Sequence, residues 1–200
     1  MEIIEQKKLI RKKIKELKCL FTSGQTDVMS GIICNKVLEL QEFKDAHTIL
    51  LYNSLPDEVK TSILLESYKK GKKIVLPVVK GDNLILKEYI PSQLQVGYMN
   101  ILEPCGDDII DPKEIELAVI PGIAFDSHCH RLGRGKGYYD RLLPQTNCTK
   151  VGICYSFQIV ENIPVDRNDI KMDIVITDCN LYSYKQEYLD SYDNSQANSL

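Results

Sequence analysis

The chain has 200 residues, of which 44% are hydrophobic and 26% are charged, as in an ordinary globular protein. Its formal net charge of −3 excludes a global attraction for nucleic acid or anionic membranes, so any anion site has to be local. No apolar run approaches the roughly 20 residues that span a bilayer, and no signal-peptide pattern is present. We therefore expect a cytoplasmic protein with one domain.

Three helices and one strand are predicted in the first third of the chain. Apolar residues at helical spacing predict a helix over about residues 5–21, whose polar face carries many lysines. A second helix is predicted over about residues 26–40, and the apolar run HTILLY predicts a buried strand after it. Pro56 and Asp57 predict the start of a third helix, which Gly71 ends.

Strands dominate the prediction for the rest of the chain. KIVLPVV and LILKEYI flank residues 81–83, which predicts two strands with a tight connection at a sheet edge or in a small lobe. ELAVIPGIAF, KVGICYS and DIVIT predict three more strands, and a helix is predicted over about residues 137–143. This alternation favours an α/β domain with a largely parallel central sheet flanked by helices. We expect the domain to span residues 1–181 and the polar, tyrosine-rich segment 182–200 to be loosely ordered.

The stretch RLGRGKGYYD, residues 131–140, follows the most hydrophobic predicted strand after a short polar loop. Its glycines let successive backbone N–H groups turn toward a bound anion, and its arginines and lysine supply positive charge. The helix that follows adds a positive partial charge at its N-terminus. The spacing matches neither a Walker A loop nor a dinucleotide fingerprint. A polyphosphate site is one interpretation, and a surface turn with incidental charges is the other.

Several carboxylates near this stretch are candidates for Mg²⁺, which prefers hard oxygen ligands. Asp140 is the better candidate, because it stands four residues after Lys136. Asp166, Asp169 and Asp173 form a later acidic cluster, and acidic residues that flank a turn are usually just solvated. The residues alone therefore favour Asp140 without choosing among the other three.

Other features have competing interpretations. Glu58, near a predicted strand end, could accept hydrogen bonds from an amino-bearing ring or supply favourable charge at a helix N-terminus. The basic first helix is a nucleic-acid arm, a membrane-surface helix or a solvated face that also reaches a phosphate. His128-Cys129-His130 suggests a metal site, but adjacent ligands cannot chelate one ion alone. The seven cysteines show no Cys-x-x-Cys pair, so we expect reduced thiols rather than disulfides or a zinc ribbon.

Four segments taken together resemble one known family. PGIAFD…RLGRGKGYYDRLL, the N-terminal KKLIRKKIKEL, LPDEV and the later IPVDRNDIKMD closely resemble the 5-formyltetrahydrofolate cyclo-ligase family, also called methenyltetrahydrofolate synthetase. The resemblance covers nearly the whole chain before the tail. It implies a three-layer α/β/α domain of the NagB/RpiA/CoA-transferase-like kind.

The activity that the resemblance implies is an ATP- and Mg²⁺-dependent ring closure of 5-formyltetrahydrofolate to 5,10-methenyltetrahydrofolate, with release of ADP and phosphate. A formamide oxygen is a poor leaving group. Phosphorylation would convert it into a phosphate that departs when N10 attacks the adjacent carbon. Such chemistry requires positioning and charge neutralisation more than a protein nucleophile.

The resemblance also implies site residues. ATP would be bound by the basic helix and the glycine-rich stretch, through Lys7, Arg11, Arg131, Leu132, Gly133, Arg134, Gly135, Lys136, Gly137, Tyr138 and Tyr139. The catalytic residues would be Arg134, Lys136 and Tyr138. The same three would face the folate, whose pterin would be held by Glu58. The Mg²⁺ ligands would be Asp140 and Asp169.

Two positions depart from the family pattern. Cys129 stands where related sequences commonly carry glycine, so a loop entry that needs a positive φ would have to be built differently here. Asn168 stands where many members have histidine, so a protonatable group at that position cannot be essential.

Two other hypotheses compete with the cyclo-ligase. One is a single-stranded nucleic-acid-binding module that uses the basic helix and the Arg/Gly/Tyr loop, with tyrosines stacking on bases. The acidic net charge argues against it. The other is a family member that has lost the activity, against which the intact glycine-rich motif argues. We expect a monomer with a small-molecule substrate and neither a nucleic-acid nor a membrane partner.

Overall fold

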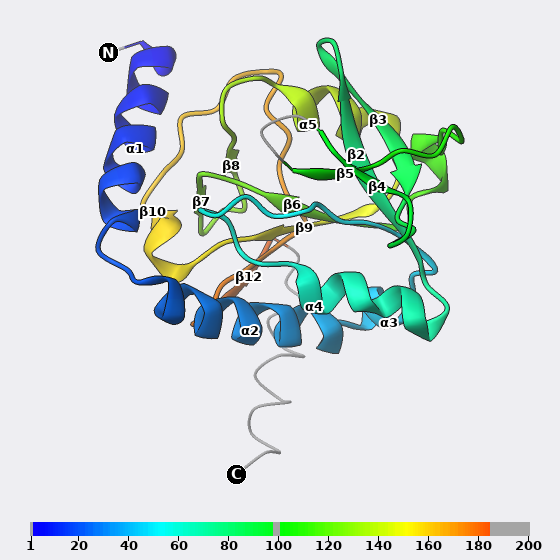
Figure 1. The fold of residues 1–200 in the computed structure, drawn as a ribbon. Helices are drawn as coiled ribbons and strands as arrows, with labels where there is room; N and C mark the ends of the chain where they lie inside the picture. Colours follow the sequence, from blue (N-terminus) through cyan, green and yellow to red (C-terminus); the bar gives the residue numbers. More distant parts are fainter. Residues whose placement is uncertain (1, 98–100, 185–200) are drawn as a thin grey trace.

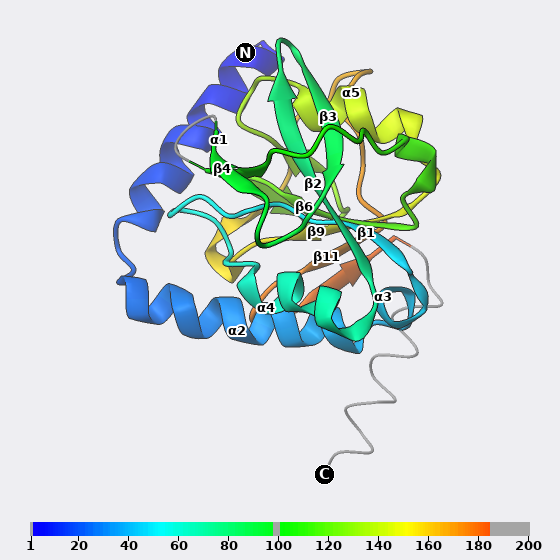
Figure 2. The same cartoon turned by 45° about the vertical axis from the view of Figure 1, so that its right-hand side comes forward.

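The computed structural model describes residues 2–97 and 101–184, and these form a three-layer α/β arrangement (Figure 1). In Figure 1 the central sheet lies between α2, α3 and α4 on one side and α5 on the other. Figure 2 shows the same layers after a 45° turn. The predicted α/β fold with a mostly parallel central sheet is therefore confirmed.

Seven strands form the central sheet, in the order β12-β11-β9-β6-β1-β2-β3. The five inner strands run parallel to one another, and each edge strand runs antiparallel to the inner strand beside it. Their bounds are β1 Thr48–Leu50, β2 Lys73–Lys80, β3 Asn83–Glu88, β6 Leu117–Pro121, β9 Thr149–Ile153, β11 Ile174–Ile176 and β12 Leu181–Ser183. The β2–β3 hairpin therefore lies at an edge of the sheet, one of the two places expected for it.

Each inner strand is apolar on both faces, because helices or loops cover both sides of the sheet. In β1, for example, Ile49 belongs to one core cluster and Leu50 to the other, and both are fully buried. The first cluster packs against α2 (Ser23–Glu39), α3 (Gln41–Asp45) and α4 (Ser62–Leu65). The second includes Leu142 of α5 (Tyr138–Leu142) and Leu143, which begins the 3₁₀ helix η4 (Leu143–Gln145).

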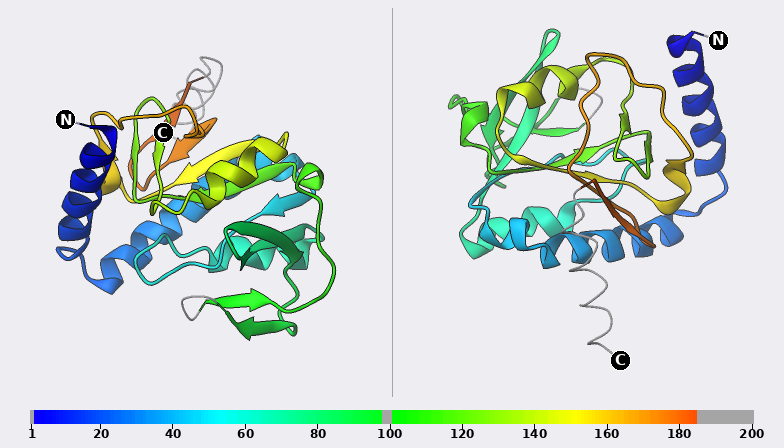
Figure 3. Two further views of the ribbon diagram at one scale, coloured as in Figure 1. Left: turned by 90° about the horizontal axis from the view of Figure 1, so that it is seen from above. Right: turned by 180° about the vertical axis from the view of Figure 1, so that it is seen from behind.

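The basic helix α1 (Ile3–Lys18) packs beside the sheet rather than over it, as Figure 3 shows from above. Its buried Ile14 forms a third cluster with Ala124, Leu132 and Ile163. Two of these partners lie in a small sheet: Ala124 in β7 (Ala124–Asp126) and Leu132 in β8 (Arg131–Leu132), which begins the glycine-rich stretch. The third strand of this sheet is β10 (Ile159–Val160). The small sheet therefore joins the basic helix to the glycine-rich stretch. None of the helices in the described part of the chain is long and apolar enough to cross a membrane.

The remaining elements are short connections. They are the hairpin of β4 (Leu94–Val96) and β5 (Leu102–Pro104) and the 3₁₀ helices η1 (Glu66–Lys70), η3 (Pro112–Glu114) and η5 (Ser156–Gln158). Gly71 follows η1 with a φ of 81°, which only glycine adopts easily, so its predicted role as a helix end is confirmed.

Three boundaries differ from the sequence prediction. Pro56 and Asp57 do not begin a helix: Glu58 N–H donates to the Leu55 carbonyl at 3.0 Å, which closes a β-turn, and α4 begins only at Ser62. Proline at the second position of a turn is as favourable as proline at the start of a helix, so the local sequence could not distinguish them.

The other two differences concern strands. ELAVIPGIAF is two strands, because β6 ends at Pro121 and β7 pairs with other partners in the small sheet. Strand β12 runs to Ser183, so the sheet extends past residue 181, where the domain was expected to end. Residues 185–200 of the expected loose tail lie outside the described residues.

Candidate functional site

The glycine-rich stretch begins in β8, turns through residues 133–137 and enters α5. Gly137 caps α5 with a φ of 66°, and a Cβ there would lie 2.7 Å from Nη1 of Arg141. A Cβ at Gly133 would lie 2.8 Å from Nη1 of Arg131. A side chain at either position would displace an arginine that packs against the loop, and at Gly137 the positive φ would strain it as well.

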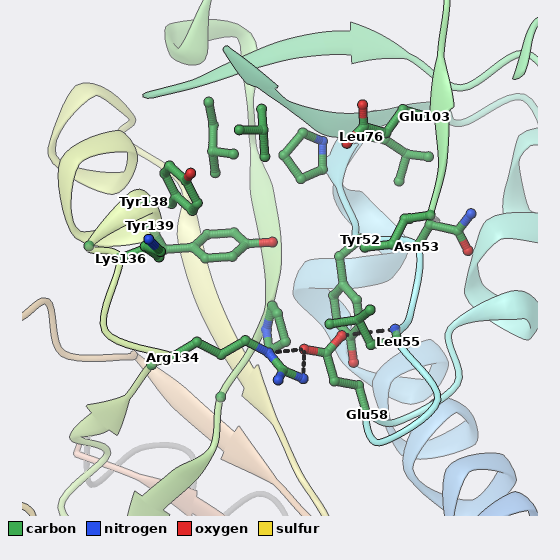
Figure 4. Close-up of a pocket in the computed structure, with 18 of the residues that line it drawn as sticks. Tyr52, Asn53, Leu55, Glu58, Leu76, Glu103, Arg134, Lys136, Tyr138 and Tyr139 are labelled. Carbon is green, nitrogen blue, oxygen red and sulfur yellow. Dashed lines mark hydrogen bonds and ion pairs between the residues drawn. The ribbon is translucent and has the colours of Figure 1, made fainter. Parts of the chain in front are cut away.

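A pocket of about 360 Å³ lies between this stretch and the carboxyl ends of β1 and β6, where ligands collect in α/β sheets (Figure 4). We call it the tyrosine pocket, after Tyr52, Tyr138 and Tyr139 in its lining. The residues assigned to folate by resemblance all line it: Glu58, Arg134, Lys136 and Tyr138. Segments far apart in sequence therefore bring these four side chains to one cavity.

Glu58 reaches this pocket from the turn after β1, not from a helix. Its Oε2 accepts from the Leu55 N–H at 3.1 Å, and its Oε1 accepts from Arg134 at 3.2 Å (Nε) and 3.0 Å (Nη2). The Glu58 carbonyl accepts a hydrogen bond from the Tyr155 hydroxyl at 2.9 Å. In Figure 4 Arg134 extends across the pocket toward Glu58. The suggested role of Glu58 as helix N-terminal charge is therefore wrong.

Arg131 begins the glycine-rich stretch and is buried, with a residue exposure of 5%. Its Nη2 donates to Asp140 Oδ1 at 2.7 Å, and its guanidinium lies 5.5 Å from the centre of the Tyr139 ring. Its Nε is buried and has no hydrogen-bond partner among the described residues. A buried donor without a partner is costly, which is typical of a site that a ligand completes.

A second pocket, of about 700 Å³, lies on the other side of the stretch. We call it the ion-pair pocket, because it is lined by Lys7, Arg11, Asp140 and Asp169. The predicted ATP residues divide between the pockets. Those that line the ion-pair pocket are Lys7, Arg11, Leu132, Gly133, Gly135 and Gly137. Those that line the tyrosine pocket and not the ion-pair pocket are Arg131, Arg134, Lys136, Tyr138 and Tyr139.

Lys7 and the late acidic cluster meet in the ion-pair pocket. Lys7 Nζ donates to Asp169 Oδ2 at 2.5 Å and to Asp166 Oδ2 at 2.9 Å. Burial acts to lower the pKa of Lys7, but the hydrogen bonds and charges of the two carboxylates outweigh it and raise that pKa. Asp173 does not join them: it accepts from the Lys150 N–H at 2.7 Å and lines neither pocket.

Arg11 ties α1 to the glycine-rich stretch. Its Nε donates to the Gly133 carbonyl at 2.9 Å, and its guanidinium lies within 4.0 Å of where a Cβ of Gly135 would stand. Burial lowers the pKa of Arg11, although the group stays charged at neutral pH. The basic helix is therefore not merely a solvated face, because one of its sides forms a wall of this pocket.

The loop that enters the glycine-rich stretch is held by Asp126, which is fully buried. Its Oδ1 accepts from the N–H groups of His128 and His130, and its Oδ2 accepts from the Ile163 N–H at 3.0 Å and lies 3.0 Å from His130 Nδ1. No group of three metal-binding side chains occurs within the described residues, the His-Cys-His run included. Asp126 gave no signal in the sequence beyond its place in PGIAFD.

The structure shows how the chain accommodates Cys129, the first departure from the family pattern. It adopts a φ of 65°, the left-handed conformation that glycine prefers, and its side chain is fully buried in the second core cluster. The loop entry is therefore built with the positive φ and a cysteine, which costs about 1–2 kcal/mol of backbone strain. Asn168, the second departure, lines the ion-pair pocket, and its N–H donates to Asp166 Oδ1 at 2.9 Å.

Two charged residues near the site were given no role in it from the sequence. Asp57 contacts Arg134 Nη2 at 2.6 Å, and Arg141 donates to the Lys136 carbonyl at 3.0 Å while it also contacts the Asp82 carbonyl. Arg141 lies 5.6 Å from the Tyr138 ring centre. Arg141 follows directly on Asp140 in the quoted motif, but two of its partners, Asp82 and Asn83, come from a hairpin 58 or more residues away in sequence.

The chain is similar to proteins of known activity along most of its length. The model of the 5-formyltetrahydrofolate cyclo-ligase family matches residues 3–178. A probable 5-formyltetrahydrofolate cyclo-ligase of Schizosaccharomyces pombe is 34% identical over 172 residues, 76% of this chain and 84% of the relative. The 5-formyltetrahydrofolate cyclo-ligase of Escherichia coli K12 is 29% identical over 181 residues, 86% of this chain and all of the relative.

A solved structure shares the fold. The 5,10-methenyltetrahydrofolate synthetase of Aquifex aeolicus matches with a TM-score of 0.82 and 34% identity, over 90% of this chain and 93% of that chain. The synthetase of Mycoplasma pneumoniae matches with a TM-score of 0.71 and 28% identity, over 86% and 98%.

Proposed function

Because the chain belongs to the 5-formyltetrahydrofolate cyclo-ligase family, we propose that it closes 5-formyltetrahydrofolate to 5,10-methenyltetrahydrofolate with consumption of ATP. One observation carries the proposal beyond family membership. The glycine-rich stretch separates two pockets, and Gly133, Gly137 and Asp140 line both of them. A reaction that moves a phosphoryl group from one substrate to another needs two adjoining sites with positive charge at their boundary.

The folate is assigned to the tyrosine pocket. A pterin is a flat ring with amino and ring N–H donors, and Glu58 offers a carboxylate whose side chain is only 11% exposed. Tyr138 and Leu76 supply aromatic and aliphatic surface in the same lining. We assign Glu58 to the pterin. The opposite wall, which carries Arg134, Lys136 and Tyr138, is assigned to the reacting end of the folate.

ATP and Mg²⁺ are assigned to the ion-pair pocket and its boundary. Hard carboxylate oxygens on Asp140 and Asp169, beside the cations Lys7 and Arg11, fit a metal–polyphosphate pair. Gly133, Gly135 and Gly137 line this pocket and carry no Cβ, so a phosphate can approach the loop backbone closely. ATP supplies the phosphoryl group that turns the formyl oxygen into a leaving group.

The residues of this chain contribute charge rather than a nucleophile. Lys136 is exposed at the boundary, and none of the ion pairs found among the described residues involves it. Its ammonium is therefore available to neutralise the oxygens of a transferring phosphoryl group. Arg134 approaches from the same stretch, and the tyrosines supply aromatic surface beside the reacting end. Positioning and electrostatic stabilisation account for the chemistry.

Mg²⁺ alone should bind weakly, because internal cations already neutralise both proposed ligands: Asp169 is paired with Lys7 and Asp140 with Arg131. A nucleotide brings phosphates that can replace the carboxylates as partners of these cations. We expect Mg²⁺ alone to raise the melting temperature by about 1 °C or less, and MgADP at about 100-fold its Kd to raise it by roughly 5–10 °C. Thermal scans with each ligand and with both check this, and a full shift with Mg²⁺ alone would contradict it.

The activity is tested directly by the near-ultraviolet absorbance of methenyltetrahydrofolate. Purified protein is mixed with 5-formyltetrahydrofolate, with MgATP present and then omitted. Growth of the absorbance band that depends on MgATP supports the reaction and both co-substrates. Folded protein that produces no band would contradict the proposed function.

A further inference from the structure

Asp57 lies between two cations that come from distant parts of the chain. Lys18 Nζ, at the end of α1, donates to Asp57 Oδ2 at 2.8 Å and to its carbonyl at 2.5 Å. Arg134 Nη2, from the glycine-rich stretch, donates to Asp57 Oδ1 at 2.6 Å. Each carboxylate oxygen of Asp57 thus holds one cation, and the residue links α1, the turn after β1 and the glycine-rich stretch.

The charges around Asp57 and Arg134 favour these contacts. Partial burial acts to raise the pKa of Asp57, but hydrogen bonds and charges from Lys18 and Arg134 outweigh it and hold that pKa below its ordinary value. Burial acts to lower the pKa of Arg134, and Asp57 and Glu58 outweigh it in the same way and raise that pKa. Two carboxylates on one guanidinium form a network, which fixes geometry better than an isolated surface pair does.

The guanidinium of Arg134 is held along one edge and open along another. Its Nε and Nη2 donate to Asp57 and Glu58, whereas its Nη1 has no hydrogen-bond partner within residues 2–97 and 101–184. Arg134 lines the tyrosine pocket. Nη1 is therefore the guanidinium nitrogen that remains available to a ligand while the other edge stays anchored.

Glu58 cannot serve as the permanent anchor, because its Oε2 already accepts the Leu55 N–H and its Oε1 is the oxygen that Arg134 contacts. A pterin bound at Glu58 would compete with Arg134 for the same carboxylate. Asp57 lines neither pocket, so a ligand in either one leaves it in contact with Arg134.

We propose that Asp57 is a positioning residue that keeps Arg134 aimed into the tyrosine pocket when the substrate occupies Glu58. This inference rests on the proposed function. Lys18 holds Asp57 in turn, so a residue at the end of the basic helix supports the placement of Arg134 without touching a substrate.

The first experiment compares turnover of Asp57→Asn with that of the wild-type chain. The near-isosteric change removes the charge, and we expect kcat to fall roughly 10–100-fold with the KM for 5-formyltetrahydrofolate within about 3-fold of wild type. Glu58→Gln should instead raise that KM. Asp57→Glu, which restores the charge, should recover part of kcat. Unchanged kcat in Asp57→Asn, or the same rise in KM as in Glu58→Gln, would overturn the positioning role.

Asp27→Asn is the matched control. Asp27 has a side chain that is 50% exposed, against 43% for Asp57, and it also pairs with a lysine, Lys60, but it lines neither pocket. Its loss should leave both kcat and KM unchanged. A fall in kcat of Asp27→Asn equal to that of Asp57→Asn would show that any lost surface charge has this effect, which would overturn the proposal.

A second measurement tests the contact without turnover. Arginine side-chain ¹H–¹⁵N spectra are recorded for the ligand-free Glu58→Ala chain, in which Asp57 is the one carboxylate left of the two that contact Arg134. The Arg134 guanidinium should still rotate slowly, and its signal is told apart from that of the buried Arg131 by its loss when Arg134→Lys is added. Adding Asp57→Asn to Glu58→Ala should abolish this slow rotation, whereas adding Asp27→Asn should keep it. Persistence of the slow Arg134 signal in the chain with both Glu58→Ala and Asp57→Asn would overturn the hold on Arg134. A wild-type chain that forms no product would contradict the proposed function, and these spectra would still decide whether Asp57 holds Arg134.

Discussion

Replacing Lys136 by alanine should remove most of the turnover and leave the fold intact. Lys136 lines the tyrosine pocket at its boundary with the second pocket, and it is exposed with no ion pair among those of the described residues. Its loss therefore leaves no buried group without a partner, while it removes positive charge from the place where the phosphoryl group is proposed to transfer. We expect kcat to fall by roughly 10²–10³-fold, the magnitude for one preorganised electrostatic contact.

The measurement is the methenyltetrahydrofolate absorbance assay with saturating MgATP, together with a thermal scan of the variant. Lys12→Ala is the control, because Lys12 is an exposed lysine of α1 that lines neither pocket. It should keep wild-type turnover. Full activity in Lys136→Ala would remove Lys136 from the mechanism.

Replacing Arg131 by methionine should have the largest effect on stability. Arg131 is 5% exposed, and its partner Asp140 has a side chain that is only 20% exposed. Removing one member of a buried pair leaves the other charge without compensation, which costs about 3 kcal/mol. For a chain of this size we expect the melting temperature to fall by roughly 6–12 °C.

A double-mutant cycle identifies the cause. Arg131→Met combined with Asp140→Asn removes both charges, so it should destabilise the chain less than the sum of the single changes. Arg167→Met, at an exposed arginine, should change the free energy of unfolding by less than about 0.5 kcal/mol. Strict additivity of the two single changes would show that the Arg131–Asp140 pair does not carry this effect.

The layers of the fold could be predicted from the sequence, because burial leaves a periodic pattern in it. The helix predicted over residues 5–21 is found at Ile3–Lys18, and Phe21 after it stacks on Phe157 with ring centres 4.3 Å apart. The turn at Pro56 was misjudged because turns and helix starts share the same local residues. Where a pattern serves two structures, only contacts with the rest of the chain decide between them.

Motifs in the sequence could predict which residues belong to the site, but they could not predict which of these residues contact one another. Lys7 and Asp169 were assigned to different ligands, and the structure pairs them across 162 residues of sequence. Asp57 and Arg141 lie within the quoted motifs, but the sequence assigned neither a role in the site, because their roles come from the loops beside which they fold. Sequence motifs name the residues near a substrate, whereas residues that hold those in place are found from three-dimensional contacts.

The shared wall between the pockets has a thermodynamic consequence. Gly133, Gly137 and Asp140 line both cavities, so a shift of this backbone that improves the fit of one ligand alters the space offered to the other. Any resulting coupling is reciprocal: the factor by which a folate changes the affinity for a nucleotide equals the factor by which the nucleotide changes the affinity for the folate. A single shared segment can thereby make the occupancy of each site report on the other.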